Sequence, residues 1–371
     1  MEDLYELWLH SICNFEPEKA EKMVDLFENG ENRFSSGELD RRKLHKIGLE
    51  EEFADKISDS KYFREAKDIL NYCNKNGIRI ITRDSEEYPE YLKHTNTPPR
   101  ILFAKGERIN LNNKLMVSVV GSRTPTDRGK EVARRIGKSL AKEGIIVVSG
   151  MADGIDGQAH IGALEAGGKT VAVLAGSVDA IYPKANSKLY HEILKNGMVL
   201  SERPPGTAVK PYFYQQRNRI VVGLSHGAVI VEGERQSGTS ITARLALDNN
   251  RDIFAVPGNP LAKQSALPNW LISEGAMIVD NVDVPAEYYK ETRPEFFKDK
   301  PIRNEEKRKV NGLSPDDERI IKAIEMKGGI ACIEDLAEIC GFAPNVLASK
   351  LTILCIRGIL RQESGNRYII N

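Results

Sequence analysis

The central part of the chain alternates short apolar runs with segments of about helix length. Between residues 111 and 285 the apolar runs are, in order, LMVSVV, IIVV, TVAVLA, MVL, AVIVE, DIFAVP and AMIVD. Parallel strands buried on both faces read as nearly continuous apolar runs, and a helical crossover usually connects each strand to the next. The pattern therefore predicts an α/β fold with a parallel sheet and helices on both of its faces.

This topology also predicts where a ligand would bind. Right-handed crossovers place the loops that follow the strands along one edge of the sheet. Open α/β sheets of the Rossmann-like kind bind ligands in a crevice outside the carboxyl ends of the strands. We therefore expect the functional residues in the segments that directly follow the apolar runs.

The flanking sequence predicts further domains, because 371 residues exceed what a single core usually covers. Residues 1–75 read as short helices, a small N-terminal helical domain of the SAM or helix-hairpin-helix kind. Within it, KLHKIGLEEEFADKI predicts a helix-turn-helix hinged at Gly48, which either touches a DNA backbone or belongs to a plain helical domain. Residues 76–285 form the Rossmann-like core, with a joining segment rich in Pro and Tyr that packs the helices onto it.

The C-terminal part predicts a linker and one more domain. Residues 286–312 are charged and lack an apolar period, which is typical of an exposed linker, and residues 313–371 show the helix, helix, β-hairpin order of a winged helix. Winged helices often bind duplex DNA through the second helix of the turn, here residues 344–357. That helix has few cations and many acids around it, so a role in protein interaction stays open beside duplex binding. The cations are Lys350 and Arg357, and the acids are Asp316, Asp317, Glu318, Glu334, Asp335 and Glu338.

Charge and composition restrict the kinds of site. Lys plus Arg equals Asp plus Glu at 53 each, so there is no global positive field and any DNA site must be local. The most basic stretch, residues 121–142, reads either as such a site or as a solvated helix face. The opening residues contain acids and no long apolar run, so we expect neither a signal peptide nor a membrane anchor, and a cytoplasmic location. The five cysteines form no C-x-x-C pair, so we expect reduced thiols, no disulfide and no metal site.

The first apolar run ends in a turn that suits an anion. Gly121 permits the sharp turn, and a helix begins near Thr126 and Asp127, where backbone amides and the helix dipole favour negative charge. Arg123 could grip a phosphate at two points. The fingerprints G-x-G-x-x-G and G-x-x-x-x-G-K-[ST] are both absent here, so NAD and ATP lose support and we expect no cofactor.

The second loop carries a carboxylate and a histidine. Gly150 and Gly154 flank a helix start, and Asp156 and His160 lie four residues apart on one face of that helix. They form either a metal or acid/base pair or, as we prefer, a structural arrangement in which the carboxylate caps the helix. No Ser-His-Asp order, Cys-His pair or paired carboxylates indicate catalysis, so we expect a binding protein and not an enzyme.

Three more loops reach the same edge and add basic and aromatic residues. Aromatic side chains beside cations suit stacked bases on a phosphate track, although some of these residues must belong to the core. The candidates are Lys184 and Asn186 after the third run; Lys210, Tyr214, Arg217, Asn218 and Arg219 in KPYFYQQRNR; and Gly238 and Thr239 at a further helix start.

Taken together, these loops resemble the DNA-processing protein A (DprA/Smf) family. The resemblance runs from YPEYLKHTNTPPRILFAKG to GAMIVD, with a weaker similarity in the C-terminal domain, and its motifs are GSR, SGMADGIDGQAH, GGKTVAVLAGSVDAIYP, SERPPGT, RNRIVVGLS, VEGERQSGTSITARLA and VPGN. It implies a protein that binds single-stranded DNA cooperatively and dimerises through the Rossmann-like core. It also implies a partner, a RecA-type recombinase that is loaded onto incoming strands during natural transformation (competence) and recombination.

Residue by residue, the resemblance implies a pocket in which Arg123 holds a phosphate while Tyr214 stacks on a base, a contact worth about 1–3 kcal/mol per base. Its other members would be Gly121, Ser122, Lys184, Arg217, Asn218, Arg219 and, as a looser match, Lys210. The chain departs from the family pattern at Asp153, where a basic residue is usual, at Ser177 and Leu267, where Gly is usual, and at Gln215, where Pro is usual. Asp153 would weaken binding.

Two other functions compete with strand binding. One is a nucleotide-hydrolysing enzyme of the lysine-decarboxylase-like Rossmann group, whose loop has a Gly-Gly pair and a Glu three residues after the Thr. This chain has Gly238-Thr239 but Thr242 and Ala243 in that neighbourhood, which disfavours hydrolysis. The other is a scaffold that acts through the winged helix, with incidental DNA contact.

Overall fold

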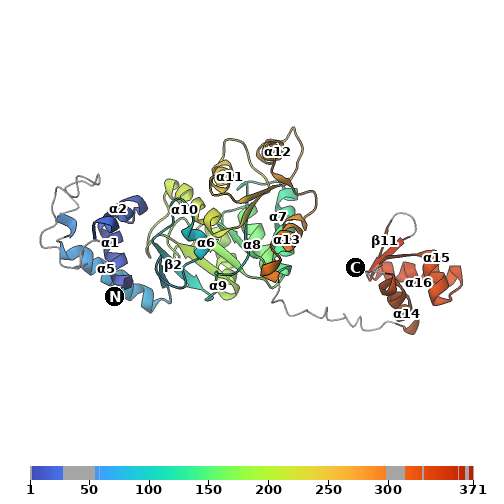
Figure 1. Ribbon diagram of the computed structural model, residues 1–371. Coiled ribbons are helices and arrows are strands. Elements are labelled where there is room, and N and C mark those ends of the chain that lie inside the picture. The colour runs from blue at the N-terminus through green and yellow to red at the C-terminus, as the bar shows by residue number, and fades with distance from the viewer. Residues whose placement is uncertain are drawn as a thin grey trace. The chain divides into compact units, whose positions relative to one another are not determined.

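The computed structural model divides the chain into two compact units, Met1–Lys298 and Asp299–Asn371 (Figure 1). It describes residues 2–27, 55–57, 59–297, 314–327, 330–357, 359–363 and 367–370. The helix-turn-helix expected around Gly48 lies outside these residues, apart from its end.

In the described part of the first unit, nine strands form one sheet in the order β1-β2-β6-β5-β4-β3-β7-β8-β9. The seven strands from β6 to β9 pair in parallel, which confirms the predicted α/β core, and the joining segment adds β1 and β2 as antiparallel strands beside β6. The strands are β1 (Arg79–Thr82), β2 (Ile101–Gly106), β3 (Met116–Val120), β4 (Ile146–Ser149), β5 (Thr170–Val173), β6 (Met198–Ser201), β7 (Gly227–Ile230), β8 (Asp252–Ala255) and β9 (Met277–Ile278).

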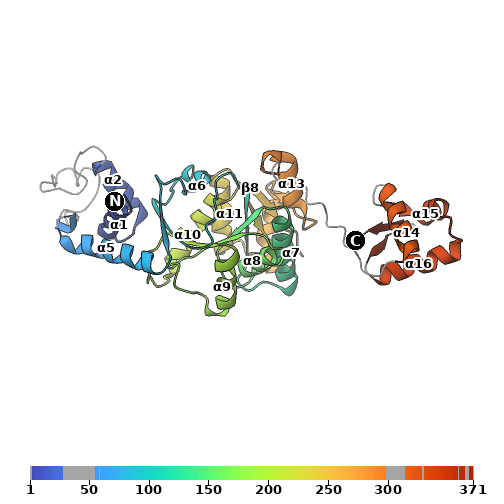
Figure 2. The same cartoon turned by 90° about the horizontal axis from the view of Figure 1, so that it is seen from below.

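Helices cover both faces of the sheet, as predicted (Figure 2). Alternate residues of one strand enter different cores: Met116 packs with α6, α10, α11 and α12, whereas Val117 packs with α7, α8 and α13. The helices are α6 (Glu90–Lys93), α7 (Asp127–Lys142), α8 (Ile155–Glu165), α9 (Ser187–Asn196), α10 (Pro211–Leu224), α11 (Gly238–Asp248), α12 (Ala266–Ser273) and α13 (Val284–Thr292), with 3-10 turns η1 (Lys184–Asn186), η2 (Lys263–Ser265) and η3 (Pro294–Phe297).

The N-terminal helices share a core with the sheet. Side chains of α1 (Glu2–Ile12), α2 (Pro17–Phe27) and α5 (Ser60–Lys75) belong to one hydrophobic cluster with Phe103 of β2 and Val199 of β6. The boundary predicted at residue 75 therefore does not separate two cores.

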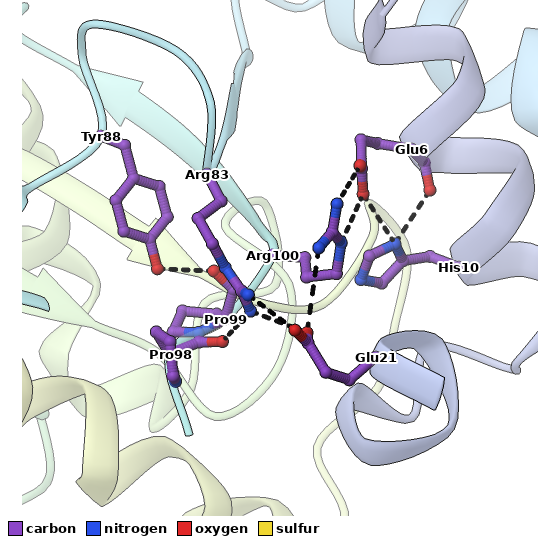
Figure 3. A network of polar contacts seen from close by, with 8 residues as sticks. All are labelled: Glu6, His10, Glu21, Arg83, Tyr88, Pro98, Pro99 and Arg100. Carbon is purple, nitrogen blue, oxygen red and sulfur yellow. Dashed lines mark hydrogen bonds and ion pairs between the residues drawn. The ribbon is translucent and has the colours of Figure 1, made fainter. Parts of the chain in front are cut away.

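Ion pairs reinforce this attachment (Figure 3). Arg100, at the start of β2, donates to both carboxylate oxygens of Glu6 at 2.7 and 3.2 Å, and both side chains are buried. Arg83 holds Glu21 of α2 at 2.8 and 2.9 Å and also donates to the carbonyl of Pro98. The joining segment thus packs the helical part onto the core, as expected.

The predicted linker over residues 286–312 is wrong at its beginning. Ala286 and Tyr289 of α13 are buried, and the Tyr289 hydroxyl donates to Asp252 at 2.9 Å. These two residues stand three apart among charged neighbours, and this spacing alone does not indicate a helix with a buried face. The first unit therefore extends to residue 297 in the described part of the chain.

The second unit has its own core and its own sheet, β10-β12-β11, with antiparallel pairs. Its helices and hairpin follow the predicted order, and β10 adds a strand that was not predicted; the winged-helix assignment stays a prediction. The elements are α14 (Pro315–Met326), β10 (Ile330–Cys332), α15 (Ile333–Cys340), α16 (Pro344–Ile356), β11 (Leu360–Glu363) and β12 (Arg367–Ile370).

In the part of the chain that the structure describes, no one helix has the length and apolar character to cross a membrane. The segments Ile333–Cys340 and Pro344–Cys355 meet that criterion only as a pair, across a bend of 112°.

Candidate nucleic-acid interface

A cleft of about 930 Å³ opens at the carboxyl edge of the sheet, where β3 lies between β4 and β7 and the strand order changes direction. The loops after β3, β4 and β7 line it, together with α10 and α11. Most of the residues selected from the sequence meet here: Gly121, Ser122, Arg123, Gly150, Asp156, Tyr214, Arg217, Asn218, Gly238 and Thr239.

Five other candidates do not line the cleft: Gly154, Lys184, Asn186, Lys210 and Arg219. The Asn186 amide donates to the carbonyl of Met151 at 3.0 Å, and the Lys210 ammonium lies 5.7 Å from the ring of Phe213. Arg219 forms an ion pair with Glu202 at 2.5 Å, so its charge is already neutralised inside the protein.

Close packing fixes the turn after β3. A Cβ atom at Gly121 would lie 2.7 Å from Cγ1 of Ile155 and 2.8 Å from the carbonyl oxygen of Glu232, so no larger residue fits. The next amide, that of Ser122, donates to the same carbonyl at 2.8 Å. The turn therefore presents Arg123 from a rigid support.

The anion expected at the start of α7 is a side chain of the protein itself. The Glu232 carboxylate accepts hydrogen bonds from the amide of Thr126 at 2.9 Å and from its hydroxyl at 2.5 Å, while this hydroxyl also caps the amide of Gly129 at 3.0 Å. The expectation that this helix start receives a phosphate is therefore wrong, since a carboxylate from the end of β7 already occupies it.

The start of α11 is open instead. The N-cap Ser237 makes no side-chain capping bond, and its hydroxyl donates to the carbonyl of Glu234 at 2.7 Å. Apart from its chain neighbours and the backbone of its own helix, no described atom lies within 4 Å of the position that a Cβ would take at Gly238. Ser237, Gly238, Thr239 and Ser240 all line the cleft, so the first-turn amides of an uncapped helix face a space where an anion fits.

Arg123 and Tyr214 form a stacked pair at the cleft. The guanidinium carbon lies 4.3 Å from the centre of the tyrosine ring, and Arg123 is exposed while Tyr214 is half-buried. Burial raises the pKa of Tyr214. Within the described residues, no carboxylate forms an ion pair with Arg123, so its charge is available to a ligand.

The floor of the cleft is polar and buried. Arg217 donates to the carbonyl of Val173, and Asp156 accepts from the amide of Gly150 at 3.2 Å. Burial raises the pKa of Asp156 and lowers the pKa of Arg217, because each charge has lost its water. A side chain at Gly150 would collide with the Arg217 guanidinium, which explains a glycine at that place.

His160 takes no part in this floor. Its ring is fully buried, Nδ1 lies 2.6 Å from the hydroxyl of Thr170, and burial lowers its pKa to about 3. Among the residues that the structure describes, no group of three or more His, Cys, Asp or Glu could hold a metal ion. The hydrogen bonds of Asp156 to the Gly150 amide and of His160 to Thr170 support the structural interpretation of these two residues.

Comparison with known proteins decides the family. The family model described as "DNA recombination-mediator protein A" matches residues 79–290. The DNA processing protein DprA of Bacillus subtilis is 39% identical over 211 residues, which cover 57% of this chain and 71% of that protein. The chain belongs to the DprA family. A putative DprA of Mycobacterium tuberculosis is 31% identical over 343 residues, 89% of this chain and 86% of its own length.

Solved DprA structures resemble this fold. The X-ray structure of DprA from Streptococcus pneumoniae has a TM-score of 0.61 at 32% identity and covers 76% of this chain and 97% of that chain. A DprA structure from Helicobacter pylori, described by its single-stranded DNA binding mode, has a TM-score of 0.53 at 29% identity and covers 58% and 96%. DprA proteins are DNA-processing proteins of recombination and not enzymes, which agrees with the expectation from the sequence.

The departures from the DprA pattern now have positions. Asp153 is exposed and lines a smaller hollow of about 70 Å³ together with Arg123 and Tyr214, so its carboxylate does lie near the candidate strand path. Gln215 is exposed and lines the main cleft. Ser177 is buried with its hydroxyl on the carbonyl of Thr207 at 3.3 Å, and Leu267 is buried in the core.

Sequence reasoning missed several exposed residues of the cleft, among them Tyr182, Glu234 and Gln236. The tyrosine stood within the motif GGKTVAVLAGSVDAIYP, so an aromatic at the end of a strand loop could have been noticed. Thr242 is buried, and its hydroxyl accepts a hydrogen bond from the Asn218 amide at 3.0 Å. The hydrolase loop would carry a Glu at this position, so a buried threonine further disfavours nucleotide hydrolysis.

Proposed function

We propose that this DprA protein binds single-stranded DNA in the cleft at the carboxyl edge of its sheet. The observation that carries the proposal is the Arg123–Tyr214 pair beside the uncapped start of α11. A cation without a carboxylate partner among the described residues and an uncapped helix start suit the phosphates of a strand. The ring face of Tyr214 away from Arg123 suits a base, and such stacking tolerates every base.

We further propose the cellular role that the resemblance implies. The protein would coat and protect incoming strands and load a RecA-type recombinase onto them in natural transformation and recombination. It would act as a homodimer through the Rossmann-like core. The family description as a recombination mediator supports this role, as does the single-stranded DNA binding mode described for the Helicobacter pylori relative.

The test is a titration of labelled oligo-dT with the wild type and with Arg123→Ala at several salt concentrations. Binding should weaken as salt rises, and Arg123→Ala should bind about ten-fold more weakly with a salt slope smaller by about one charge. Lys114→Ala is the matched control, because Lys114 is exposed next to the amino end of β3, away from the cleft edge. If the wild type does not bind oligo-dT, or if its affinity does not change with salt concentration, the proposal is refuted.

A further inference from the structure

A second arginine–aromatic pair lies next to the cleft. The guanidinium carbon of Arg235 is 4.8 Å from the centre of the Trp270 ring. Arg235 is exposed and Trp270 is half-buried. In the described part of the chain Arg235, like Arg123, has no carboxylate partner. The structure therefore repeats, on another loop, the arrangement of the Arg123–Tyr214 pair.

The backbone fixes the position of this second pair relative to the cleft. Arg235 belongs to the loop after β7, and its two neighbours in sequence, Glu234 and Gln236, line the cleft while Arg235 itself does not. The amide of Gly233 in the same loop donates to the carbonyl of Gln264 at 2.6 Å, just before α12 begins.

A second bond ties the loop to α12 itself. The Leu267 amide donates to the carbonyl of Gly233 at 3.0 Å, and a Cβ at Gly233 would lie only 3.1 Å from the Leu267 side chain. Leu267 is a position where the chain departs from its family, one turn before Trp270 on α12. The loop and the helix that carry Arg235 and Trp270 are thus locked together beside the cleft.

We propose that Arg235 and Trp270 form a second contact site for the same single strand, next to the cleft on the side of α12. Arg235 would hold a phosphate of a nucleotide that has left the cleft, and Trp270, which packs partly against the core, would offer the exposed part of its indole ring to the base. The inference rests on the proposed strand binding and adds a length requirement to it.

Length is the first measurable consequence. An oligo-dT of about 4 nucleotides, near the lower end of single-strand sites, fills the cleft alone, whereas one of about 16 nucleotides reaches both pairs. Arg235→Ala and Trp270→Ala should therefore lower the affinity for the long oligo about five-fold or more and leave the short one unchanged. Arg123→Ala should weaken both. Lys114→Ala should weaken neither.

Fluorescence gives an independent readout of direct contact. The chain has two tryptophans, and Trp8 is buried in α1. Trp8→Phe makes Trp270 the sole reporter. The long oligo should quench its emission and the short oligo should not, while the anisotropy of the labelled oligo records binding in the same sample. Trp270→Phe should restore most of the affinity lost in Trp270→Ala, because a ring remains for stacking.

The outcomes separate the two proposals. If the long oligo binds the wild type but neither quenches Trp270 nor loses affinity in Arg235→Ala, the second contact site is refuted and the cleft proposal stands. Arg235 lies on an exposed loop, so this variant does not depend on core packing. If the wild type binds no oligo of either length, both proposals fall.

Discussion

Glu232 determines which helix start at the cleft can receive a phosphate. Its carboxylate, from the loop after β7, accepts from the amide and the hydroxyl of Thr126, the N-cap of α7, so a side chain of the protein already occupies that helix start. The start of α11 lacks such a partner and stays open. At the scale of single residues, the Glu232 side chain thus decides that an anion can bind at the start of α11 and not at the start of α7.

His226 is expected to make the stability of the fold depend on pH. Its ring stacks on Tyr91 with centroids 4.1 Å apart, and its Nδ1 accepts the amide of Met116 at 3.3 Å. Burial lowers its pKa to about 4 from 6.5. The unfolded chain therefore takes up the proton first, so the contribution of His226 to stability is complete above about pH 6.5 and is lost as the pH falls toward 4.

Urea unfolding from about pH 7 to about pH 4 measures this effect. The free energy of unfolding of the wild type should fall by roughly 3 kcal/mol more over this window than that of His226→Gln, because 1.36 kcal/mol corresponds to one pKa unit. Carboxylates and His160 titrate in both proteins and cancel in the difference. Equal pH dependence of the two proteins would contradict the assignment.

The sequence predicted those site residues whose signal is local. Gly121 and Arg123 follow a strand directly, and Tyr214 lies among cations, so each could be found from its neighbours. The roles of Glu232 and Arg219 could not, because their partners lie far along the chain: Thr126 is 106 residues from Glu232, and Thr97 is 122 residues from Arg219. Contacts of this kind pair a charged side chain with a group of the protein itself, and no local sequence pattern indicates them.

At the scale of elements, one face of α10 lines the cleft and another contacts Arg203. Tyr214, Arg217 and Asn218 line the cleft on one face. On the other, Arg203 from the loop after β6 donates to the Gln216 side chain and to the carbonyl of Phe15, both at 2.5 Å, and stacks on Phe213. The N-terminal helices thereby hold the helix that shapes the cleft.

Replacing Arg203 by Ala should therefore weaken strand binding without any loss of a DNA contact. It leaves the buried carbonyl of Phe15 and the half-buried side chain of Gln216 without this donor, so we expect the free energy of unfolding to fall by about 2 kcal/mol. The affinity for oligo-dT should drop while the slope of log affinity against log salt stays at the wild-type value, because no phosphate contact is lost. Chemical denaturation and the salt series measure the two effects. A reduced slope would show instead that Arg203 touches the strand.

At the scale of the whole molecule, the two units are independent in their cores. The second unit packs around residues such as Leu347 and Leu351 of α16. Lys350 of α16 and Arg357, its C-cap, lie near acids of α14, Lys350 at 2.9 Å from Asp316 and Arg357 at 3.8 Å from Asp317. These two cations are thus already paired within the second unit.

Truncation after Lys298 tests this division of labour. The shortened chain should keep its cooperative unfolding and its affinity for oligo-dT within about three-fold, because the cleft lies entirely in the first unit. Anisotropy titration and circular dichroism of the two proteins give the answer. A loss of strand binding in a folded, truncated protein would contradict the proposal that the cleft of the first unit binds the strand.

The attachment of the N-terminal helices has a consequence for how this family can evolve. The family model matches residues 79–290, whereas the compact unit that contains the sheet is Met1–Lys298. Glu6 lies outside the matched segment and Arg100 lies inside it, and the two buried side chains form an ion pair. A gene fusion that replaced only the first 75 codons would leave the buried Arg100 without its carboxylate partner. The N-terminal helices and the sheet that they cover are therefore expected to be inherited together.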